Sequence, residues 1–267
     1  MHVTKMHGAR NDFVIVDARH DPVADAAGLA RFLCDRRSGI GADGLLLVEP
    51  AAAGAAATMR VINADGSEAE MCGNGIRCFA RYLDEEGEGD TLSIETESGI
   101  VRTQVISRSP EYRVKVALPA PVIPSERSAR ALSDVEGSTS RLPLYFQVIR
   151  VGNPHVVVVR DSIEGVNLDN LAAEFQKQFP DGVNVHIVSV VDEHTLRARH
   201  WERGVGQTQA CGTGAAACAV AVIERGLVRS PVEVVVPGGT LTIEWDGTTL
   251  CMIGPAERVF EATVGVP

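Results

Sequence analysis

The stretch Met71-Cys72-Gly73-Asn74-Gly75 places a cysteine at the head of a glycine-rich turn that opens a helix. A second stretch, Ala210-Cys211-Gly212-Thr213-Gly214, repeats the arrangement. A helix N-terminus presents unpaired backbone N–H groups and the positive end of the helix dipole, which bind an anion and favour a thiolate over a thiol. One such cysteine is typical of a nucleophile, and two indicate a pair.

The two stretches belong to an internal duplication. Aligning Cys72 with Cys211 also aligns four pairs of glycines without a gap: Gly73 with Gly212, Gly75 with Gly214, Gly87 with Gly226, and Gly99 with Gly238. Upstream, the blocks that begin at Asn11 and Asp43 recur in the same order at Asn153 and Asp181. Equivalent blocks in equivalent order predict two similar domains that face each other across one cleft.

The apolar pattern after each cysteine predicts what surrounds the two helices. In residues 76–85, Ile76, Phe79 and Leu83 fall on one helical face, which indicates packing against a sheet. Its twin at residues 215–223 is apolar all round and therefore needs a sheet curled about it. A β-rich hairpin follows each helix, at 92–106 and 232–245. The predicted class is α+β: two pseudo-symmetric domains, each a curled, mostly antiparallel sheet around a central helix, with the active site in the interdomain cleft.

The domain boundary is expected near Pro119, where a stretch rich in proline, serine and arginine (119–143) follows the first repeat. The last stretch, 256–264, has no counterpart before that boundary and is expected to return to the first sheet. The N-terminal domain, with Cys72, is therefore assigned to 1–118 and 255–267. The C-terminal domain, with Cys211, is assigned to 119–254.

Composition limits the classes of function. The chain has 267 residues, 45% of them hydrophobic, which is enough for two modest cores. Its net charge of −10, without a lysine or arginine cluster, argues against nucleic acid and anionic membrane as partners. Neither a signal peptide nor a membrane-spanning stretch is evident, so we expect a soluble, cytoplasmic protein with reduced cysteines. The spacing of the six cysteines matches no zinc site, and no metal is expected.

The two cysteines suit one difficult reaction, the removal of a proton from the α-carbon of an amino acid. Enzymes commonly use pyridoxal phosphate for it, but none of the three lysines here, Lys5, Lys115 and Lys177, lies beside a phosphate-binding loop. The alternative aims two helix N-termini at the carboxylate, where charge develops. One thiolate then takes the proton and the opposing thiol returns one to the other face, which inverts the stereochemistry. No cofactor is expected.

Seven blocks of the chain resemble the diaminopimelate epimerase family and follow its order from end to end: 7–13, 63–67, 71–78, 152–155, 182–185, 202–206 and 210–214. The resemblance implies an isomerase that interconverts LL- and meso-2,6-diaminopimelate without pyridoxal phosphate, in lysine and peptidoglycan precursor biosynthesis. It also implies a homodimer, with the small-molecule substrate as the main partner. Joint agreement of blocks makes this far more specific than any single motif.

The resemblance also implies roles for individual residues. It assigns catalysis to the thiols of Cys72 and Cys211, with His155 and Glu202 nearby to set their protonation. The residues implied in substrate binding are Asn11, Asn63, Gly73, Asn74, Asn153, Asn184, Glu202, Arg203, Gly212 and Thr213. Of these, the glycine turns would hold the reacting α-carboxylate, and the fork of Arg203 suits a distal carboxylate. His186 and His200 are expected to be structural, and Ala9-Arg10, Gly44 and Gln207 depart from the family pattern.

Several alternatives stay open from the sequence. The asparagines are common turn formers, and a histidine on an apolar strand such as His155 is often a core residue. A proline racemase or hydroxyproline epimerase would share the cysteine pair but has no use for a distal clamp. A relative with a carboxylate base is disfavoured because both positions are cysteine. A thiol redox sensor would also present two reactive cysteines. Entry of solvent deuterium at the α-carbon of candidate amino acids separates these readings.

Overall fold

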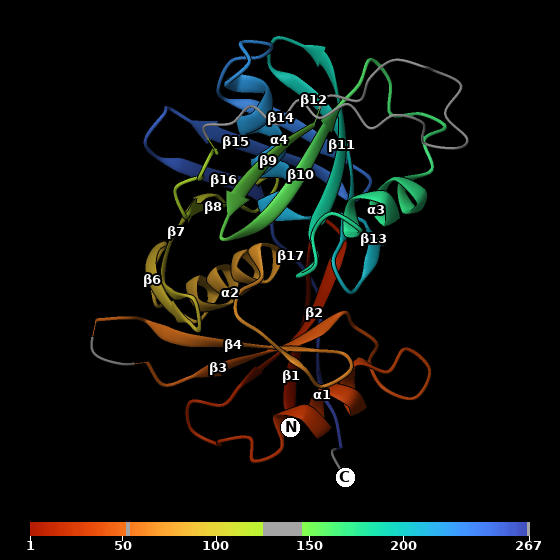
Figure 1. Cartoon of the computed structure of the whole chain (residues 1–267). Helices are drawn as coiled ribbons and strands as arrows, with labels where there is room; N and C mark the ends of the chain where they lie inside the picture. Colours follow the sequence, from red (N-terminus) through yellow and green to blue (C-terminus); the bar gives the residue numbers. More distant parts are fainter. Residues whose placement is uncertain (52–53, 125–145, 266–267) are drawn as a thin grey trace. The chain divides into compact units, whose positions relative to one another are not determined.

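The computed structural model describes residues 1–51, 54–124 and 146–265, so most of the proline-rich stretch 119–143 lies outside the described residues. The chain divides into two compact units. Unit 1 comprises Met1–Ala117 and Ile253–Pro267, and unit 2 comprises Leu118–Met252. Figure 1 shows the helices and strands of both units, with colours that follow the sequence.

Unit 1 is a curved sheet with two helices. Its elements, in chain order, are β1 (His2–Gly8), β2 (Asn11–Asp17), α1 (Ala26–Cys34), β3 (Gly44–Glu49), β4 (Ala57–Asn63), β5 (Glu68–Ala69), α2 (Gly73–Glu85), β6 (Thr91–Thr96), β7 (Gly99–Ser107), β8 (Arg113–Leu118) and, from the end of the chain, β17 (Glu257–Thr263). Strands β2 and β3 pair in parallel, as do β4 and β6. The pairings β17–β1, β1–β2, β3–β4, β4–β5, β6–β7 and β7–β8 are antiparallel.

Unit 2 repeats this order. Its elements are β9 (Phe146–Val151), β10 (Asn153–Val159), α3 (Leu168–Gln176), β11 (Asn184–Asp192), β12 (Thr195–Glu202), β13 (Gly206–Thr208), α4 (Gly212–Ile223), β14 (Val232–Val236), β15 (Gly239–Trp245) and β16 (Leu250–Pro255), whose residues from Ile253 on belong to unit 1. The parallel pairs, β10–β11 and β12–β14, stand where β2–β3 and β4–β6 stand in unit 1. The pairs β9–β10, β11–β12, β12–β13 and β14–β15 are antiparallel. The predicted α+β class and the duplication are confirmed.

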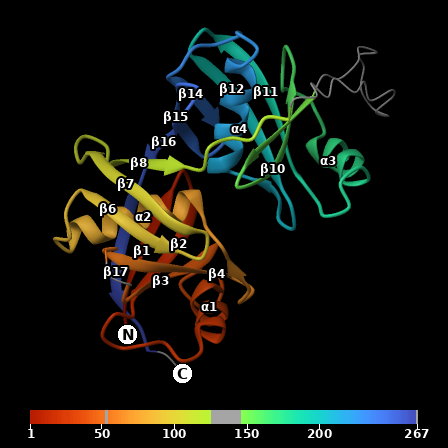
Figure 2. The ribbon, with the colours of Figure 1, turned by 60° about the vertical axis from the view of Figure 1, so that its left-hand side comes forward.

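Each unit encloses one central helix (Figure 2). Helix α2 packs against β1, β2, β3, β4 and β7 and buries Ile76, Phe79 and Leu83 completely, as its apolar pattern predicts. Helix α4 packs against β9, β10, β11, β12, β14 and β15, and it is buried on all sides from Gly214 to Val222. Both helices begin one turn earlier than the apolar pattern indicates, because each glycine turn already forms part of the helix.

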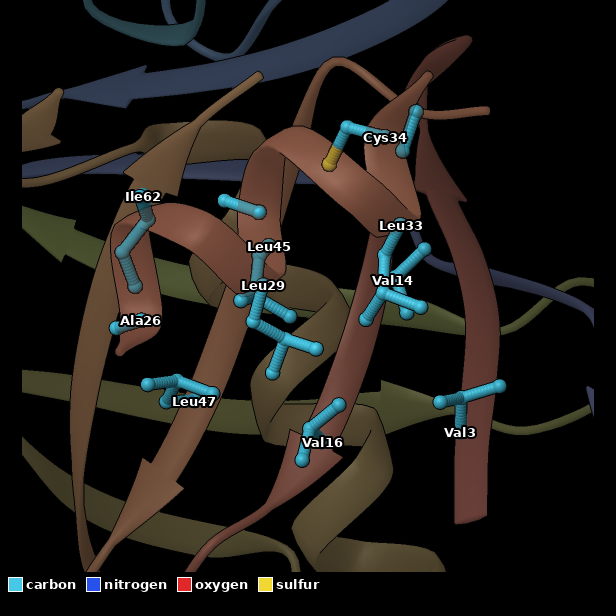
Figure 3. Packing of buried hydrophobic residues seen from close by; sticks show 12 residues of the cluster. Val3, Val14, Val16, Ala26, Leu29, Leu33, Cys34, Leu45, Leu47 and Ile62 are labelled. Carbon is cyan, nitrogen blue, oxygen red and sulfur yellow. The ribbon is translucent and has the colours of Figure 1, made fainter. Parts of the chain in front are cut away.

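A second helix covers the other face of each sheet. Figure 3 shows Leu29 and Leu33 of α1 packed against Val14 of β2 and Leu45 and Leu47 of β3. Side chains alternate along a strand, so residues at even positions of β2 and odd positions of β3 face α1, and their neighbours face α2. Asp25 caps α1 by accepting a hydrogen bond from the Gly28 N–H at 2.8 Å. Helix α3 packs on β11 and β12 in the same way.

The final strand belongs to the first sheet. Strand β17 pairs with β1 from Thr263 opposite His2 to Glu257 opposite His7. The N-terminal ammonium of Met1 donates a hydrogen bond to the Val264 carbonyl at 3.0 Å. Both ends of the described chain therefore lie in unit 1, and unit 2 is inserted between β8 and β17.

Candidate active site

Cys72 lies in the N-cap position of α2, with extended backbone. The Gly75 N–H donates to its sulfur at 3.4 Å, and the side chain is half-buried. The Asn11 Oδ1 lies 3.7 Å from the Cys72 sulfur and accepts a second hydrogen bond from the Asn74 Nδ2 at 3.1 Å. The Asn11 Nδ2 in turn donates to the Asp43 Oδ2 at 2.7 Å. These bonds fix which end of the Asn11 amide faces the thiol.

Asp43 is held by a small ionic cluster behind Asn11. Arg36 forms ion pairs of 2.7 Å with Asp12 and 2.8 Å with Asp43, and Lys5 pairs with Asp12 at 2.6 Å. Burial opposes ionisation of Asp12, but hydrogen bonds from Arg36 and Lys5 hold its pKa well below the usual range. Asp12 therefore stays ionised near neutral pH, and the cluster supports Asn11 from the side away from Cys72.

Among the described residues, the Asn63 side chain is not hydrogen-bonded to Cys72, Asn11 or Asp43. Its Nδ2 donates to the Ser67 Oγ at 3.0 Å, and its backbone N–H donates to the Ser67 carbonyl at 2.8 Å. It sits at the end of β4, opposite Gly44 of β3. A Cβ at Gly44 would lie 2.9 Å from the Ile62 carbonyl oxygen, so the backbone leaves little room there for a larger residue.

Cys211 occupies the equivalent N-cap position of α4 and is buried, with its sulfur 3.8 Å from the Thr213 Oγ1. The Glu202 carboxylate accepts a hydrogen bond from Cys211 and another, at 2.6 Å, from the Thr208 Oγ1. Burial, followed by the negative charge of Glu202, raises the pKa of the Cys211 thiol well above its usual value. Burial also raises the pKa of Glu202. Both groups therefore hold protons more tightly than they would in water.

Three buried histidines stand in a hydrogen-bonded row beside Cys211. The His155 Nδ1 is 2.8 Å from the His186 Nε2, and the His186 Nδ1 is 2.9 Å from the His200 Nδ1. A Cβ built on Gly214 would lie 2.5 Å from the His186 ring and 3.0 Å from the Cys211 sulfur, so the row reaches the head of α4. Burial, reinforced by His200, lowers the pKa of His155 to about 3, and burial lowers that of His200 to about 4. All three rings are neutral at pH 7.

The remaining predicted binding residues lie at the ends of β10, β11 and β12. The Asn184 Oδ1 accepts a hydrogen bond from the Arg203 backbone N–H at 2.9 Å. The Arg203 guanidinium donates to the Asp181 carbonyl at 2.7 Å, and its stem passes close over Gly182, whose φ is 75°. Asn153 begins β10 and is exposed. The structure thus brings Asn184 and Arg203 together, next to Glu202 in the chain.

Three residues near the cysteines have contacts that the sequence did not indicate. His186 and His200, expected to be structural, are buried and lie in one row with His155. Arg77 of the first cysteine block, for which the sequence indicates no role, bonds through its guanidinium to the turn that carries Cys72. The repeated Asp-Gly pair at Asp43 was a usable signal for the support of Asn11. Within the described ranges, no group of three or more histidine, cysteine or acidic side chains is arranged to hold a metal ion.

No helix in the described part of the chain is long and apolar enough to cross a membrane.

A family model described as diaminopimelate epimerase matches residues 3–122 and 147–259. The chain belongs to the diaminopimelate epimerase family. A diaminopimelate epimerase of Rhizorhabdus wittichii is 43% identical over 97% of this chain and 93% of its own length. Another, of Sphingopyxis alaskensis, is 43% identical over 97% and 95%. The family named from the cysteine blocks is confirmed, and it is a family of isomerases.

Solved structures agree on the fold. A predicted epimerase of Pseudomonas aeruginosa matches with a TM-score of 0.73 and 15% identity, covering 100% of this chain and 99% of that chain. A hydroxyproline epimerase of Agrobacterium vitis matches with a TM-score of 0.71 and 15% identity, covering 99% and 90%. At such identity these neighbours speak for the fold alone. The family assignment, which favours a diaminopimelate over a proline substrate, rests on the sequence relatives.

Proposed function

We propose that this protein epimerises LL-2,6-diaminopimelate to meso-diaminopimelate with two cysteines and no cofactor. The observation that carries the proposal is the pair of cysteines at equivalent N-cap positions, Cys72 before α2 and Cys211 before α4. A cysteine in this position lies beside unpaired helix N–H groups, which are suited to an anion. Membership of the family supplies the substrate.

The first part of the proposed mechanism concerns the α-carboxylate. The turns Gly73-Asn74 and Gly212-Thr213 each present backbone N–H groups at a helix N-terminus. When the α-proton leaves, negative charge moves into the carboxylate, and N–H groups fixed in advance stabilise it without reorganisation. The same turns bind the ground-state carboxylate less strongly because it carries less charge, so they lower the barrier rather than only KM.

The second part concerns the protons. One thiolate removes the α-proton and becomes a thiol, while the opposing thiol gives its proton to the other face and becomes a thiolate. Glu202, hydrogen-bonded to Cys211, is placed to take the Cys211 proton when that residue must act as the base. Its raised pKa brings it closer to neutral pH and makes this exchange easier. We assign to His155, as a neutral imidazole, a part in setting the protonation of the thiols; it is linked to the head of α4 through His186.

The third part concerns the other end of the substrate. The Arg203 guanidinium is anchored by a single donor to the Asp181 carbonyl. A guanidinium has five N–H donors, so a fork remains for the distal carboxylate of diaminopimelate. We also assign substrate binding to Asn11, Asn63, Asn153 and Asn184, of which Asn184 fixes the Arg203 backbone. A substrate with one amino-acid head would leave this clamp unused.

The proposal extends to the working state of the protein. We assign residues 1–118 with 255–267 and residues 119–254 to two epimerase domains, in a cytoplasmic homodimer. A reducing compartment suits the chemistry because both proposed acid–base groups are free thiols. Light scattering of the purified protein tests the dimer, and a mass corresponding to a single 28.4 kDa chain would exclude it.

The reaction itself is tested by NMR in deuterium oxide. LL-diaminopimelate should lose its α-proton signal and convert to the meso form, with a rate unchanged by a chelator or by a carbonyl-trapping reagent. Proline and trans-4-hydroxyproline serve as matched substrates with one amino-acid head. Exchange of either of these without exchange of diaminopimelate would overturn the assigned substrate. Loss of rate with the chelator or trapping reagent would overturn the cofactor-free mechanism.

A further inference from the structure

Arg77 is a fully buried cation that the proposed mechanism does not use. It follows Cys72 by five residues and points back along α2 to its first turn. Its Nη1 donates to the Gly73 carbonyl at 2.9 Å, and its Nη2 donates to the Asn74 Oδ1 at 2.9 Å. A third bond, of 3.1 Å, joins its Nε to the Pro255 carbonyl. The guanidinium is therefore fixed behind the turn proposed to bind the α-carboxylate.

This position is electrostatically unfavourable in the absence of an anion. The N-terminus of a helix already carries partial positive charge, so a cation there opposes the dipole. Removing the guanidinium from water adds a further cost. Burial lowers the pKa of Arg77 to about 10; Cys78 and Cys72 favour its charged form when they are ionised, and the cation of Arg113 opposes it. A guanidinium kept there is stabilised whenever negative charge arrives at the head of α2.

Of the two thiols, Cys72 is the one suited to carry that charge. Cys78 is completely buried, and burial raises its pKa to about 12, which keeps it as a thiol at neutral pH. Cys72 is half-buried and receives the Gly75 N–H. The other anion that reaches this turn in the proposed function is the substrate α-carboxylate. The Cys72 thiolate and the substrate α-carboxylate would both lie in the positive electrostatic potential of the Arg77 guanidinium.

The hydrogen bonds of Arg77 also order the polar groups around Cys72. Since Asn74 accepts from Arg77 through its Oδ1, its Nδ2 must face the Asn11 Oδ1, which it does at 3.1 Å. Asn11 is thereby held with its oxygen toward Cys72 and its Nδ2 toward Asp43. One buried side chain thus sets the orientation of two amides that the family resemblance assigns to substrate binding.

We propose that Arg77 is a positioning residue that supplies the counter-charge for an anion at the head of α2. The inference rests on the proposed function for one of its two anions, the α-carboxylate, and stands without it for the other, the Cys72 thiolate. The aligned position in α4 is Ala216, and Cys211 lies beside the carboxylate of Glu202 instead. The counter-charge therefore belongs to one of the two cysteine sites.

The test compares Arg77→Met and Arg77→Lys with a matched control, Arg81→Met. Arg81 lies one turn further along α2 and forms an ion pair with Glu85 at 2.9 Å, so its loss removes a cation from the same helix away from the cysteine. The first measurement, without substrate, is the pH profile of Cys72 alkylation by iodoacetamide, followed by peptide mass spectrometry. The second is kcat and KM for LL-diaminopimelate. Thermal unfolding of each variant accompanies both.

Arg77→Met should slow Cys72 alkylation at pH 7 about tenfold, because the midpoint of the alkylation pH profile should rise by about one pH unit. It should lower kcat about a hundredfold while KM changes less than about threefold, because the charge acts mainly when the carboxylate gains charge. Arg77→Lys should retain most of both, and Arg81→Met should change neither. Arg77→Met should also unfold at a lower temperature, because the carbonyls of Gly73 and Pro255 and the Asn74 Oδ1 lose a buried donor, so both measurements are made well below its unfolding transition.

The two measurements separate the two anions. A change in alkylation alone assigns Arg77 to the thiolate, and a change in kcat alone assigns it to the carboxylate. If neither differs from the unsubstituted protein by more than about twofold in folded Arg77→Met, the proposal is wrong. If Arg77→Met does not fold, the test rests on Arg77→Lys, which keeps the charge and loses the fork. A fall in alkylation rate and kcat in folded Arg77→Lys as large as that expected for Arg77→Met would overturn the proposal. If the unsubstituted protein does not act on diaminopimelate but Arg77→Met still slows Cys72 alkylation as expected, the inference about Arg77 stands and the proposed function is rejected.

Discussion

The surroundings of Cys72 and Cys211 correspond position by position, yet their side chains differ in kind. In unit 1, Leu46 of β3 pairs with Val61 of β4, and in unit 2 the paired residues of β11 and β12 are His186 and His200. Phe13 pairs with Gly44 in the parallel ladder where His155 pairs with Asn184. Three apolar side chains in one unit thus stand where the other unit carries three histidines.

The charges around the two thiols differ as well. Alignment of the repeats places Asn74 and Arg77 of α2 opposite Thr213 and Ala216 of α4. Asn63, the last residue of β4, is equivalent in the repeat to Glu202, the last residue of β12. The duplication therefore kept the backbone that aims each helix at an anion, while it changed the groups that set proton affinity. The backbone that places a cysteine at a helix N-terminus and the side chains that set the acidity of its thiol can therefore change independently.

The largest effect is expected from removing either thiol. Cys72→Ala and Cys211→Ala should each lower epimerisation about a thousandfold or more, because inversion needs an acid on one face and a base on the other. Proton NMR of LL-diaminopimelate turnover measures this. Cys218→Ala, which changes a buried cysteine inside α4, is the matched control and should keep its rate. A single-thiol variant with a tenth of the normal rate would show that the two sites are not both needed.

Arg203 tests whether the second unit also reads the distal end of the substrate. Arg203→Ala should cut kcat/KM for diaminopimelate by a factor on the order of a hundred, because a desolvated pair with the distal carboxylate is worth roughly 2 to 5 kcal/mol on truncation. Arg203→Lys keeps the charge and loses the fork, so it should recover only part. Alkylation of Cys72 without substrate should stay normal. Normal turnover by Arg203→Ala would favour a substrate with one amino-acid head.

The histidine row predicts how unit 2 responds to acid. The pKa values of His155 and His200 in the folded protein, about 3 and about 4, lie below the unfolded value of about 6.5. The unfolded chain therefore binds more protons below pH 6.5. Stability is full above that pH and falls by up to about 1.4 kcal/mol per pH unit for each histidine as the pH drops toward 4.

His186→Leu with His200→Val, which copies the Leu46 and Val61 pair of unit 1, should remove much of this acid sensitivity. Urea unfolding at pH 7.5 and at pH 5 measures it, with Leu46→Val as a control that changes the equivalent position of unit 1. An unchanged difference between the two pH values in the double variant would contradict the neutral, buried state of the row.

The smallest effect is expected at the turn before Asn11. Ala9 and Arg10 have φ values of 53° and 65°, which a residue with a side chain adopts at a cost of about 1 kcal/mol. The equivalent turn of unit 2 uses Gly152, with φ of 74°. Arg10→Gly should therefore raise the free energy of unfolding by up to about 1 kcal/mol. Denaturation curves that place Arg10→Gly below the unsubstituted protein would show that the turn is not strained.

The sequence was most informative where backbone conformation depends on glycine. The aligned glycines located α2 and α4 and the hairpins after them, because these positions need a turn or a close approach that the residue type reveals. Pairings between strands far apart in the chain are less visible. His155, His186 and His200 come from three strands, and their row exists only because β10 pairs with β11 in parallel and β11 with β12 in one register. Helices α1 and α3, covered by no glycine signal, were not predicted.

The candidate site divides in the same way. Cys72, Cys211 and Glu202 could be named from local motifs, since each lies within a block of a few residues. The hydrogen bond from Arg77 to Asn74 is also local, but the sequence does not show whether an arginine is buried or exposed. Burial depends on the closing of the sheet around α2, which involves strands from across unit 1. Residue type reveals possible chemistry, and packing decides which of those groups is used.

The return of β17 to β1 has a consequence for synthesis of the protein. During translation the chain emerges in order, so unit 2 is complete before the strand that pairs with β1 has been made. Until β17 is made, the sheet of unit 1 has an open edge at β1. The carbonyl of Pro255, which binds Arg77, also arrives only after unit 2. The first sheet therefore gains the strand that covers β1, and Arg77 gains its bond to Pro255, only after all of unit 2 has been synthesised.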